Sequence, residues 1–192
     1  MAEGNRTKKQ IAQVLLHLVA EKPFSKITVQ DLAKGAGINR QTFYYHFNDK
    51  KELLRWFYLQ DSLCFLTTDE LSLENWEEQA RKMLVAMKAN GAFYQATVAD
   101  QQDILVQEFV TITSKLFHKL FETVDQEGLL SEADKLFYGR FFSYGCSGVM
   151  MDWIREGFQE TPLAISAQLF RLAKDVEFFS SRLYQTEQEE PT

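Results

Sequence analysis

The stretch "ITVQDLAKGAGINRQTFYYHFNDKKELL", residues 27–54, contains the signals of two short helices joined by a tight turn. Thr28 followed by Asp31 is an N-terminal capping signature, and Gly37 marks the end of the helix that follows. Asn39 can cap a second helix, because its side-chain oxygen can accept a hydrogen bond from a free backbone N–H. This spacing predicts a helix-turn-helix unit.

The second of these helices has an unusual outward surface. Its apolar positions, Ile38, Phe43 and Phe47, are predicted to face a core. The other positions carry planar donors, hydroxyls and an imidazole. They are Arg40, Gln41, Thr42, Tyr44, Tyr45 and His46. Arginine can form two hydrogen bonds with guanine, glutamine can do so with adenine, and hydroxyls reach phosphates. We therefore interpret this helix as one that enters the major groove of DNA.

Each outward residue also has a purely structural explanation. Tyr44 and Tyr45 could be half-buried aromatics with hydrated hydroxyls, His46 could cap a local carbonyl, and Arg40 could be a solvated charge. The charge distribution favours DNA. Residues 1–55 hold 10 Lys/Arg against 5 Asp/Glu, whereas the other 137 residues hold 11 against 22. A basic segment on a chain of net charge −6 indicates a polyanionic partner for that segment.

Helical periodicity continues on both sides of this unit. A first helix is predicted at residues 6–21 and a fourth from Asp49 to about Leu66. Further helices are predicted at about 73–89, 93–98, 103–124, 131–156 and 161–184. The 45 % hydrophobic content and the 3 prolines suit long buried helices. We expect an all-α fold of about nine helices, with a DNA-binding domain at 1–48 and a helical regulatory and dimerisation domain at 49–192.

The quoted stretch closely resembles the DNA-binding signature of TetR-family transcriptional regulators. The matching features are Thr28, Leu32–Ala33, Ala36–Gly37, Thr42, the Tyr44-x-His46-Phe47 cluster and Lys50 before Leu53. The resemblance implies that a double-stranded DNA operator is read by Arg40, Gln41 and Tyr45. It also implies phosphate contacts by Thr28, Thr42, Tyr44, His46 and Lys50, with Gln30 as a further candidate for a base or backbone contact. Asn39 and Arg40 occupy positions that vary in the family, so the operator sequence does not follow.

The same resemblance assigns a ligand pocket to the C-terminal helices. The pocket candidates are aromatic: Phe93, Tyr94, Phe109, Phe117, Phe121 and Trp153. An aromatic stripe at helical spacing is also typical of an ordinary core, so a pocket and a core remain alternatives here.

The resemblance further implies a homodimer. The last two predicted helices are apolar around more than one face, which suits a four-helix interface between two subunits. The interface candidates are Phe141, Tyr144, Val149, Leu169, Leu172, Val176 and Phe179. Gly145 and Gly148 would allow close backbone approach. The alternative is that this apolar surplus forms core within one chain.

Two C-terminal stretches, "ANGAFYQATVADQQDILVQEF" and "YGCSGVMMDWIREGF", are similar to the TetR branch that regulates dihydroxyacetone kinase operons. Two functions are therefore expected as alternatives. The first is a repressor released when an effector bound in the C-terminal domain changes the separation of the recognition helices. The second is an activator, or a regulator controlled by a protein coregulator rather than by a small molecule.

Other classes of function have little support in the sequence. Three scattered histidines form no Ser-His-Asp arrangement, and there is no phosphate-binding glycine loop, so we expect no enzyme and no cofactor. His118 with Cys146 could begin a zinc site, but further ligands are missing, so we expect no metal. Cys64 and Cys146 are interpreted as buried reduced thiols. No run of 18 apolar residues and no signal peptide is found, which predicts a cytoplasmic protein without a membrane span.

Overall fold

The computed structural model of this chain describes residues 2–68, 75–125, 128 and 130–172. Its α-helices are α1 (Ala2–Glu21), α2 (Val29–Gly35), α3 (Arg40–His46), α4 (Lys50–Asp61), α5 (Trp76–Ala89), α6 (Gly91–Val124) and α7 (Glu132–Arg155). Two short 3-10 helices are η1 (Phe24–Lys26) and η2 (Leu63–Leu66), and residues 162–172 form a further α-helix. No strand occurs in the described ranges. The all-α prediction is confirmed, and the helix count is close to the expected nine.

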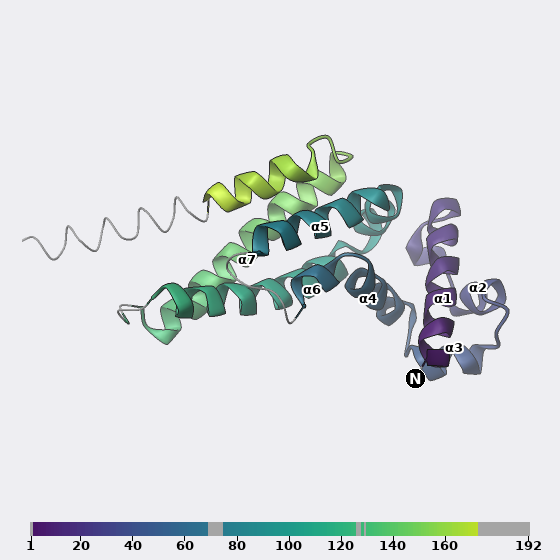
Figure 1. The fold of residues 1–192 in the computed structure, drawn as a ribbon. Helices are drawn as coiled ribbons and strands as arrows, with labels where there is room; N and C mark the ends of the chain where they lie inside the picture. Colours follow the sequence, from purple (N-terminus) through teal and green to yellow (C-terminus); the bar gives the residue numbers. More distant parts are fainter. Residues whose placement is uncertain (1, 69–74, 126–127, 129, 173–192) are drawn as a thin grey trace, which may run out of the picture.

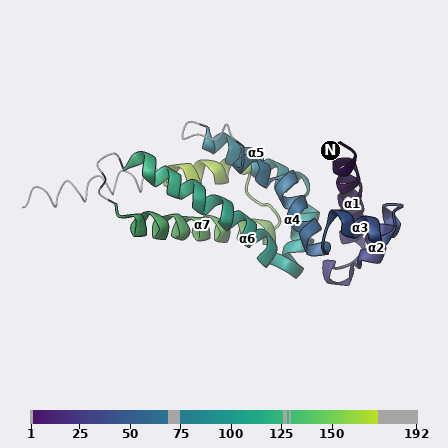
Figure 2. The ribbon, with the colours of Figure 1, turned by 90° about the horizontal axis from the view of Figure 1, so that it is seen from below.

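The helices form two parts, which we call the head and the body. The head consists of α1, α2 and α3 at one end of an elongated molecule (Figure 1). The body contains α5, α6, α7 and the helix at 162–172, and α4 lies between the two parts (Figures 1 and 2). Among the described residues, no helix combines the length and the apolar character that a membrane crossing requires.

The head is held together by an apolar centre to which all three helices contribute. Leu15 of α1, Leu32 of α2 and Phe43 of α3 are fully buried there. Close packing of α1 on α2 requires Gly35, because a β-carbon at this position would lie 2.5 Å from Cγ1 of Val14. The short helices are therefore stabilised by packing rather than by their own length.

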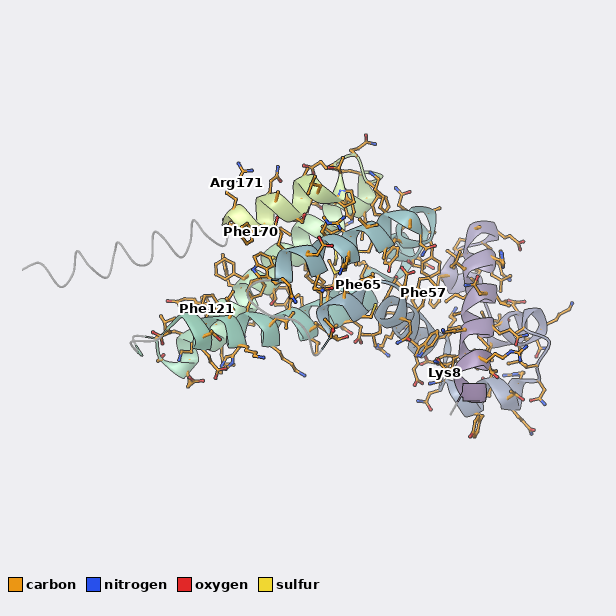
Figure 3. All side chains as sticks on the ribbon, in the orientation of Figure 1. Lys8, Phe57, Phe65, Phe121, Phe170 and Arg171 are labelled. Atoms are coloured by element: carbon orange, nitrogen blue, oxygen red, sulfur yellow. The ribbon has the colours of Figure 1, made fainter. Side chains whose placement is uncertain are left out.

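Aromatic rings join the head to the body where α4 meets α6. The ring centroids of Phe57 and Phe93 lie 4.2 Å apart, and those of Tyr58 and Tyr94 are stacked at 5.4 Å. Figure 3 labels Phe57 at this junction. All four residues are buried in the same apolar cluster as Leu53 and the head core. Head and body thus share one continuous core.

The predicted fourth helix is divided. It was expected to run from Asp49 to about Leu66, but α4 ends at Asp61. Ser62 leaves the helical conformation with φ −129° and ψ −47°, and the chain continues as η2. The buried hydroxyl of Ser62 accepts a hydrogen bond from Tyr94 on α6, so a tertiary contact accompanies the break.

Two other predicted helices share the label α6, and a kink separates them as expected. The helices expected at 93–98 and 103–124 are joined in α6, which contains one non-helical residue, Gln101, with φ −146° and ψ 49°. The last helix begins as predicted, because Thr161 Oγ1 accepts a hydrogen bond from the Ala164 N–H at 3.1 Å. Its predicted end near residue 184 lies outside the described residues.

Candidate nucleic-acid interface

The first half of the helix-turn-helix is fixed by a reciprocal cap at the start of α2. Thr28 Oγ1 accepts from the Asp31 N–H at 3.1 Å, and Asp31 Oδ2 accepts from the Thr28 N–H at 2.9 Å. Lys22, the residue that follows α1, donates to the same carboxylate at 2.8 Å. Hydrogen bonds from Lys22 and Thr28 lower the pKa of Asp31 to about 2. The predicted capping signature is confirmed.

The turn that follows places the start of α3. Gly37 has φ +64°, a conformation that glycine adopts without steric strain. Asn39 Oδ1 then accepts from both the N–H and the hydroxyl of Thr42, at 2.8 and 3.1 Å. Phe43 and Phe47 are buried in the head core, as predicted, and anchor the inner face of α3. The outer face is therefore held in a defined orientation.

The three predicted base-reading residues lie together on the outer surface of α3. Arg40 and Gln41 occupy its first two positions and are exposed. Tyr45 is 85 % exposed, and its ring lies edge-on to that of His46 at a centroid distance of 5.0 Å. Arg40 Nη2 donates to the Tyr44 hydroxyl at 3.3 Å. This helix therefore presents hydrogen-bonding groups that a DNA groove can accept.

Three of the five predicted phosphate contacts have their donors engaged within the protein. The Thr28 hydroxyl donates to Asp31 Oδ2 at 2.8 Å, in addition to accepting from the N–H of that residue. The Thr42 hydroxyl and N–H both point to Asn39 Oδ1. In this conformation these hydroxyls stabilise the starts of α2 and α3, and their hydrogens are not available to a phosphate. Lys50 is the third case.

The Lys50 ammonium binds the connection between α1 and α2. Its Nζ donates to the carbonyls of Phe24, Ser25 and Ile27 at 2.9, 2.9 and 2.7 Å. A lysine ammonium has three N–H donors, so all three are used. Burial lowers the pKa of Lys50, and the nearby Asp100 carboxylate opposes that shift. The structure gives Lys50 a structural role that differs from the predicted phosphate contact.

Of the other two phosphate candidates, His46 lies near the N-terminus of α1, whereas Tyr44 contacts Arg40 and Phe43 on α3. That terminus lies beside α3 (Figure 1), and a β-carbon on Gly4 would be 3.9 Å from His46 Cε1. Lys8, labelled in Figure 3, places its ammonium 5.2 Å from the ring centroid of Phe47. Positive charge from α1 thus lies next to α3. The basic run "RTKK" at residues 6–9 is the sequence signal for this contribution of α1.

The head and α4 also contact α6 through residues that sequence patterns do not indicate. The Ser25 N–H in η1 donates to the carboxylate of Asp100, next to the irregular residue of α6. Arg55 of α4 pairs with Glu108 of α6 at 3.3 Å. These partners are separated by 53 residues or more, and helical periodicity gives no signal for such pairings.

Most of the predicted pocket residues are core residues in the structure. Phe93, Tyr94, Phe109 and Trp153 are buried, and the Trp153 Nε1–H donates to the Glu160 carbonyl at 3.0 Å. Two surface hollows, one at residues 98–103 and one between α6 and α7, are lined by none of the six candidates. These four aromatic residues therefore belong to the core of the chain, which is the alternative to a pocket that the sequence left open.

Phe117 and Phe121 differ from the other pocket candidates, because both are only partly buried. Their ring centroids lie 5.7 and 5.9 Å from that of Phe142 on α7. Tyr138 adds a fourth ring, 5.8 Å from Phe121. This aromatic group, which Figure 3 marks by Phe121, lies between the far ends of α6 and α7.

The predicted dimer residues on α7 are exposed in the single chain. Phe141 is 65 % and Tyr144 57 % exposed, and Val149 is also exposed. Leu172 is exposed, whereas Leu169 packs partly against the core. Val176 and Phe179 lie outside the described residues. Exposed Leu136 and Phe137 extend the same helix surface, so α7 presents a large apolar area to solvent.

In the described part of the chain, the group of potential metal ligands that contains His118 consists of His118, Glu122 and Glu132 and does not include Cys146. His118 Nε2 lies 3.3 Å from a carboxylate oxygen of Glu132, Nδ1 lies 3.8 Å from one of Glu122, and the three ligand atoms lie within 4.8 Å of one another. Burial raises the pKa of the Cys146 thiol to about 11, which disfavours the reactive thiolate. Both cysteines are free thiols.

Comparison with known proteins agrees with this architecture. A family profile described as "Bacterial regulatory proteins, tetR family" matches residues 11–55, and one described as "Transcriptional regulator C-terminal region" matches residues 74–175. The dhaKLM operon transcriptional activator DhaS of Lactococcus lactis is 33 % identical over 89 residues. This alignment covers 46 % of the present chain and 47 % of DhaS, so the chain aligns with about half of that relative.

Solved structures share the fold over most of the chain. The dihydroxyacetone kinase operon activator DhaS superposes with a TM-score of 0.65 at 24 % identity, covering 86 % of this chain and 93 % of that one. NalD, a secondary repressor of a Pseudomonas aeruginosa multidrug efflux pump, gives 0.59 at 20 % identity, with coverages of 87 % and 94 %. With profiles matching both the head and the body, the chain belongs to the TetR family of transcriptional regulators.

Proposed function

We propose that this regulator is a homodimer that binds a DNA operator through two copies of α3 and represses transcription until an effector binds the body. The outward surface of α3 carries this proposal. Arg40, Gln41 and Tyr45 are exposed on a helix whose inner face and N-terminus are fixed by Phe43 and Asn39. A rigid short helix with these side chains suits direct reading of base edges.

Phosphate contacts in this proposal come from side chains that still have a free donor. The Tyr44 hydroxyl accepts from Arg40 and keeps its own hydrogen, and the His46 imidazole lies beside the basic start of α1. Thr28, Thr42 and Lys50 act indirectly, because they hold α2, α3 and η1 in place. Phosphate contacts position the head, whereas base contacts specify the sequence.

The exposed surface of α7 supports the homodimer. Phe141, Tyr144 and Val149 would be buried if two copies of α7 and the helix at 162–172 met around a two-fold axis. Two linked heads could then engage two half-sites together, which raises the affinity far above that of one head.

Effector release would act through the contacts between head and body. The aromatic group around Phe117 and Phe121 is the part of the predicted pocket whose side chains are only partly buried. A ligand that binds one arrangement of α6 and α7 more tightly than another shifts the population toward it. Asp100 joins α6 to Ser25 of η1 in the head, and Glu108 joins α6 to Arg55 of α4, so such a shift would change the separation of the two α3 helices.

Selection of DNA by the purified full chain tests this function. The protein is incubated with sheared DNA of its source genome, and retained fragments are sequenced and then measured by fluorescence anisotropy. The expected result is a small set of fragments with an inverted repeat, bound more tightly than a scrambled duplex of the same composition. Equal retention of all fragments, or no retention, would refute the proposal.

Activation is a second candidate, favoured by the relative DhaS, which is described as a transcriptional activator. Under this alternative a protein coregulator, rather than a small molecule, would act on the body. Transcript levels from the bound promoter in a deletion strain separate the two candidates. Increased transcription after deletion indicates repression, and decreased transcription indicates activation.

A further inference from the structure

We propose that Tyr44 is a positioning residue for Arg40, and that the pair makes one guanine in each operator half-site a determinant of recognition. This inference rests on the proposed function, because it requires α3 to enter the major groove. It goes beyond that function by naming the base that is read and the side chain that prepares the reader.

The two residues are one helical turn apart on the outer face of α3. Arg40 Nη2 donates to the Tyr44 hydroxyl at 3.3 Å, and the guanidinium carbon lies 5.9 Å from the centroid of the Tyr44 ring. This distance falls within the range over which a cation is attracted to an aromatic face. Tyr44 therefore restrains Arg40 both through its hydroxyl and through its ring.

Tyr44 is itself anchored to the core of the head. Its ring lies edge-on to that of Phe43, with centroids 5.7 Å apart, and Phe43 is fully buried. Tyr44 is accordingly 46 % exposed, whereas Tyr45, the next residue along, is 85 % exposed. Contacts thus run from the core through Phe43 and Tyr44 to Arg40.

Such restraint matters because an arginine on a protein surface otherwise samples many rotamers. Guanine is read by two parallel hydrogen bonds from the guanidinium to O6 and N7, and this geometry requires a defined orientation. A guanidinium has five N–H donors, so one bond to Tyr44 leaves enough donors for guanine. Orientation before binding reduces the conformational entropy that is lost in the complex.

The Tyr44 hydroxyl could position Arg40 or contact a phosphate, and these two roles can be distinguished by experiment. A phosphate contact contributes equally on every DNA sequence, so its loss weakens all duplexes by one factor. A positioning role acts only through Arg40, so its loss lowers discrimination at one base pair in each half-site. The two roles therefore predict different patterns of binding for one substitution.

The experiment uses the full chain and its best duplex, obtained by selection from a randomised library. Affinities are measured by fluorescence anisotropy for that duplex and for all single base-pair changes. The variants are Arg40→Ala, Tyr44→Phe, the double variant, and Tyr45→Phe as a matched loss of a hydroxyl on the same helix. Circular dichroism and thermal melting confirm that each variant folds.

Wild-type protein should prefer guanine at one position of each half-site, by roughly 5-fold to 100-fold per half-site. Arg40→Ala should abolish this preference. Tyr44→Phe should lower it several-fold and leave discrimination at the other positions unchanged, and it should have no effect on that preference once Arg40 is Ala. Tyr45 is itself a proposed base reader, so Tyr45→Phe should change discrimination only at the base pair that Tyr45 contacts and should leave the guanine preference intact.

Two results would overturn the inference. One is a uniform loss of affinity for Tyr44→Phe with the guanine preference retained, which would make Tyr44 a phosphate contact only. The other is a wild-type operator without a guanine whose preference depends on Arg40. Failure of the wild-type chain to select any DNA would instead refute the proposed function.

Discussion

Helix caps in the head and the junction between α4 and α6 use polar side chains over different distances along the chain. In the head, Thr28 bonds Asp31 and Asn39 bonds Thr42, so the members of each pair lie three positions apart. At the junction, Tyr58 of α4 bonds Thr97 of α6 and Tyr94 of α6 bonds Asp61 of α4, across 39 and 33 positions. Local caps define the starts of short helices independently of the rest of the fold, whereas long-range bonds depend on how the helices pack. The starts of α2 and α3 are thus specified locally, and the junction is specified by the tertiary structure.

Head and body differ in the kind of surface that they leave exposed. The head exposes hydrogen-bonding side chains on α3, and the body exposes large apolar side chains on α7. A polar, basic surface suits a nucleic acid, whereas an apolar surface suits a protein partner. Each of the following predictions tests this division.

The largest expected effect comes from placing a charge in the apolar surface of the body. Val149→Asp should convert a dimer to a monomer and weaken operator binding by about 100-fold, because avidity is lost. Light scattering coupled to size exclusion measures the mass, and anisotropy measures the affinity. Val85→Asp is the matched control, since Val85 on α5 is 44 % exposed and Val149 is 46 % exposed. If Val149→Asp remains dimeric, this surface is not the interface.

Removal of a base-reading side chain from the head should have the next largest effect. Arg40→Ala should weaken operator binding by about 1–3 kcal/mol per half-site, or roughly 30-fold or more for the dimer. The protein should stay dimeric and stable, because Arg40 is exposed. Lys119→Ala, which removes the same charge from exposed α6, is the control. Equal effects of the two substitutions would show that only net charge matters.

A third substitution tests the lysine that binds three carbonyls. Lys50→Met should lower the free energy of unfolding by about 1–3 kcal/mol, because carbonyls of Phe24, Ser25 and Ile27 lose a charged donor. Denaturant unfolding measures the change. Lys51→Met, at the exposed neighbouring position, should have little effect. Similar stabilities for both variants would assign Lys50 to phosphate binding instead.

The smallest predicted effect is a pH response with opposite sign at α2 and at α4. Hydrogen bonds from Lys22 and Thr28 lower the pKa of Asp31 from 3.8 to about 2, so its stabilisation of the head is complete above pH 4 and declines toward pH 2. Burial raises the pKa of Asp61 above 3.8, so acidification from neutral pH through that raised value should stabilise the junction between α4 and α6.

Hydrogen exchange resolved by residue tests this opposition. Between pH 7 and about pH 4, amides around Asp61 on α4 should gain protection after correction for intrinsic exchange, and Asp61→Asn should remove that gain. Below pH 4, amides of α2 should lose protection, and Thr28→Ala should lower it at all pH values, since the loss of a cap costs about 1 kcal/mol. Changes in protection of the same sign at α2 and at α4 would contradict the opposite pKa shifts of Asp31 and Asp61.

The distance along the chain between bonded partners explains which features could be predicted from the sequence. The caps at Thr28, Asn39 and Ser131 depend on neighbours three residues away, and all three caps are present in the structure. The end of α4 at Asp61 was not predicted, because Ser62 is held by Tyr94 on another helix. The break predicted between the helices at 93–98 and 103–124 is confirmed by the kink in α6 at Gln101.

For the candidate site, the sequence indicated the residue types but not their partners. The exposed positions of Arg40 and Tyr45 follow from helical periodicity around Phe43. The bond between Lys50 and the carbonyls of η1 requires the position of a loop 23 or more residues away. Periodicity likewise marks Phe93 and Trp153 as inward-facing, but it cannot distinguish a filled core from an open pocket.

The shared core at α4 limits how freely this regulator can be taken apart. Phe57 and Tyr58 pack against Phe93 and Tyr94, while Leu53 on the same helix is buried in a cluster that includes the head. If the chain is truncated before α4, the head loses its contacts with Leu53. If it is truncated after α4, the rings of Phe57 and Tyr58 become exposed to solvent. A chimera that joins this head to the body of another regulator will therefore need α4 as well. The other body will also need two aromatic residues in the places of Phe93 and Tyr94.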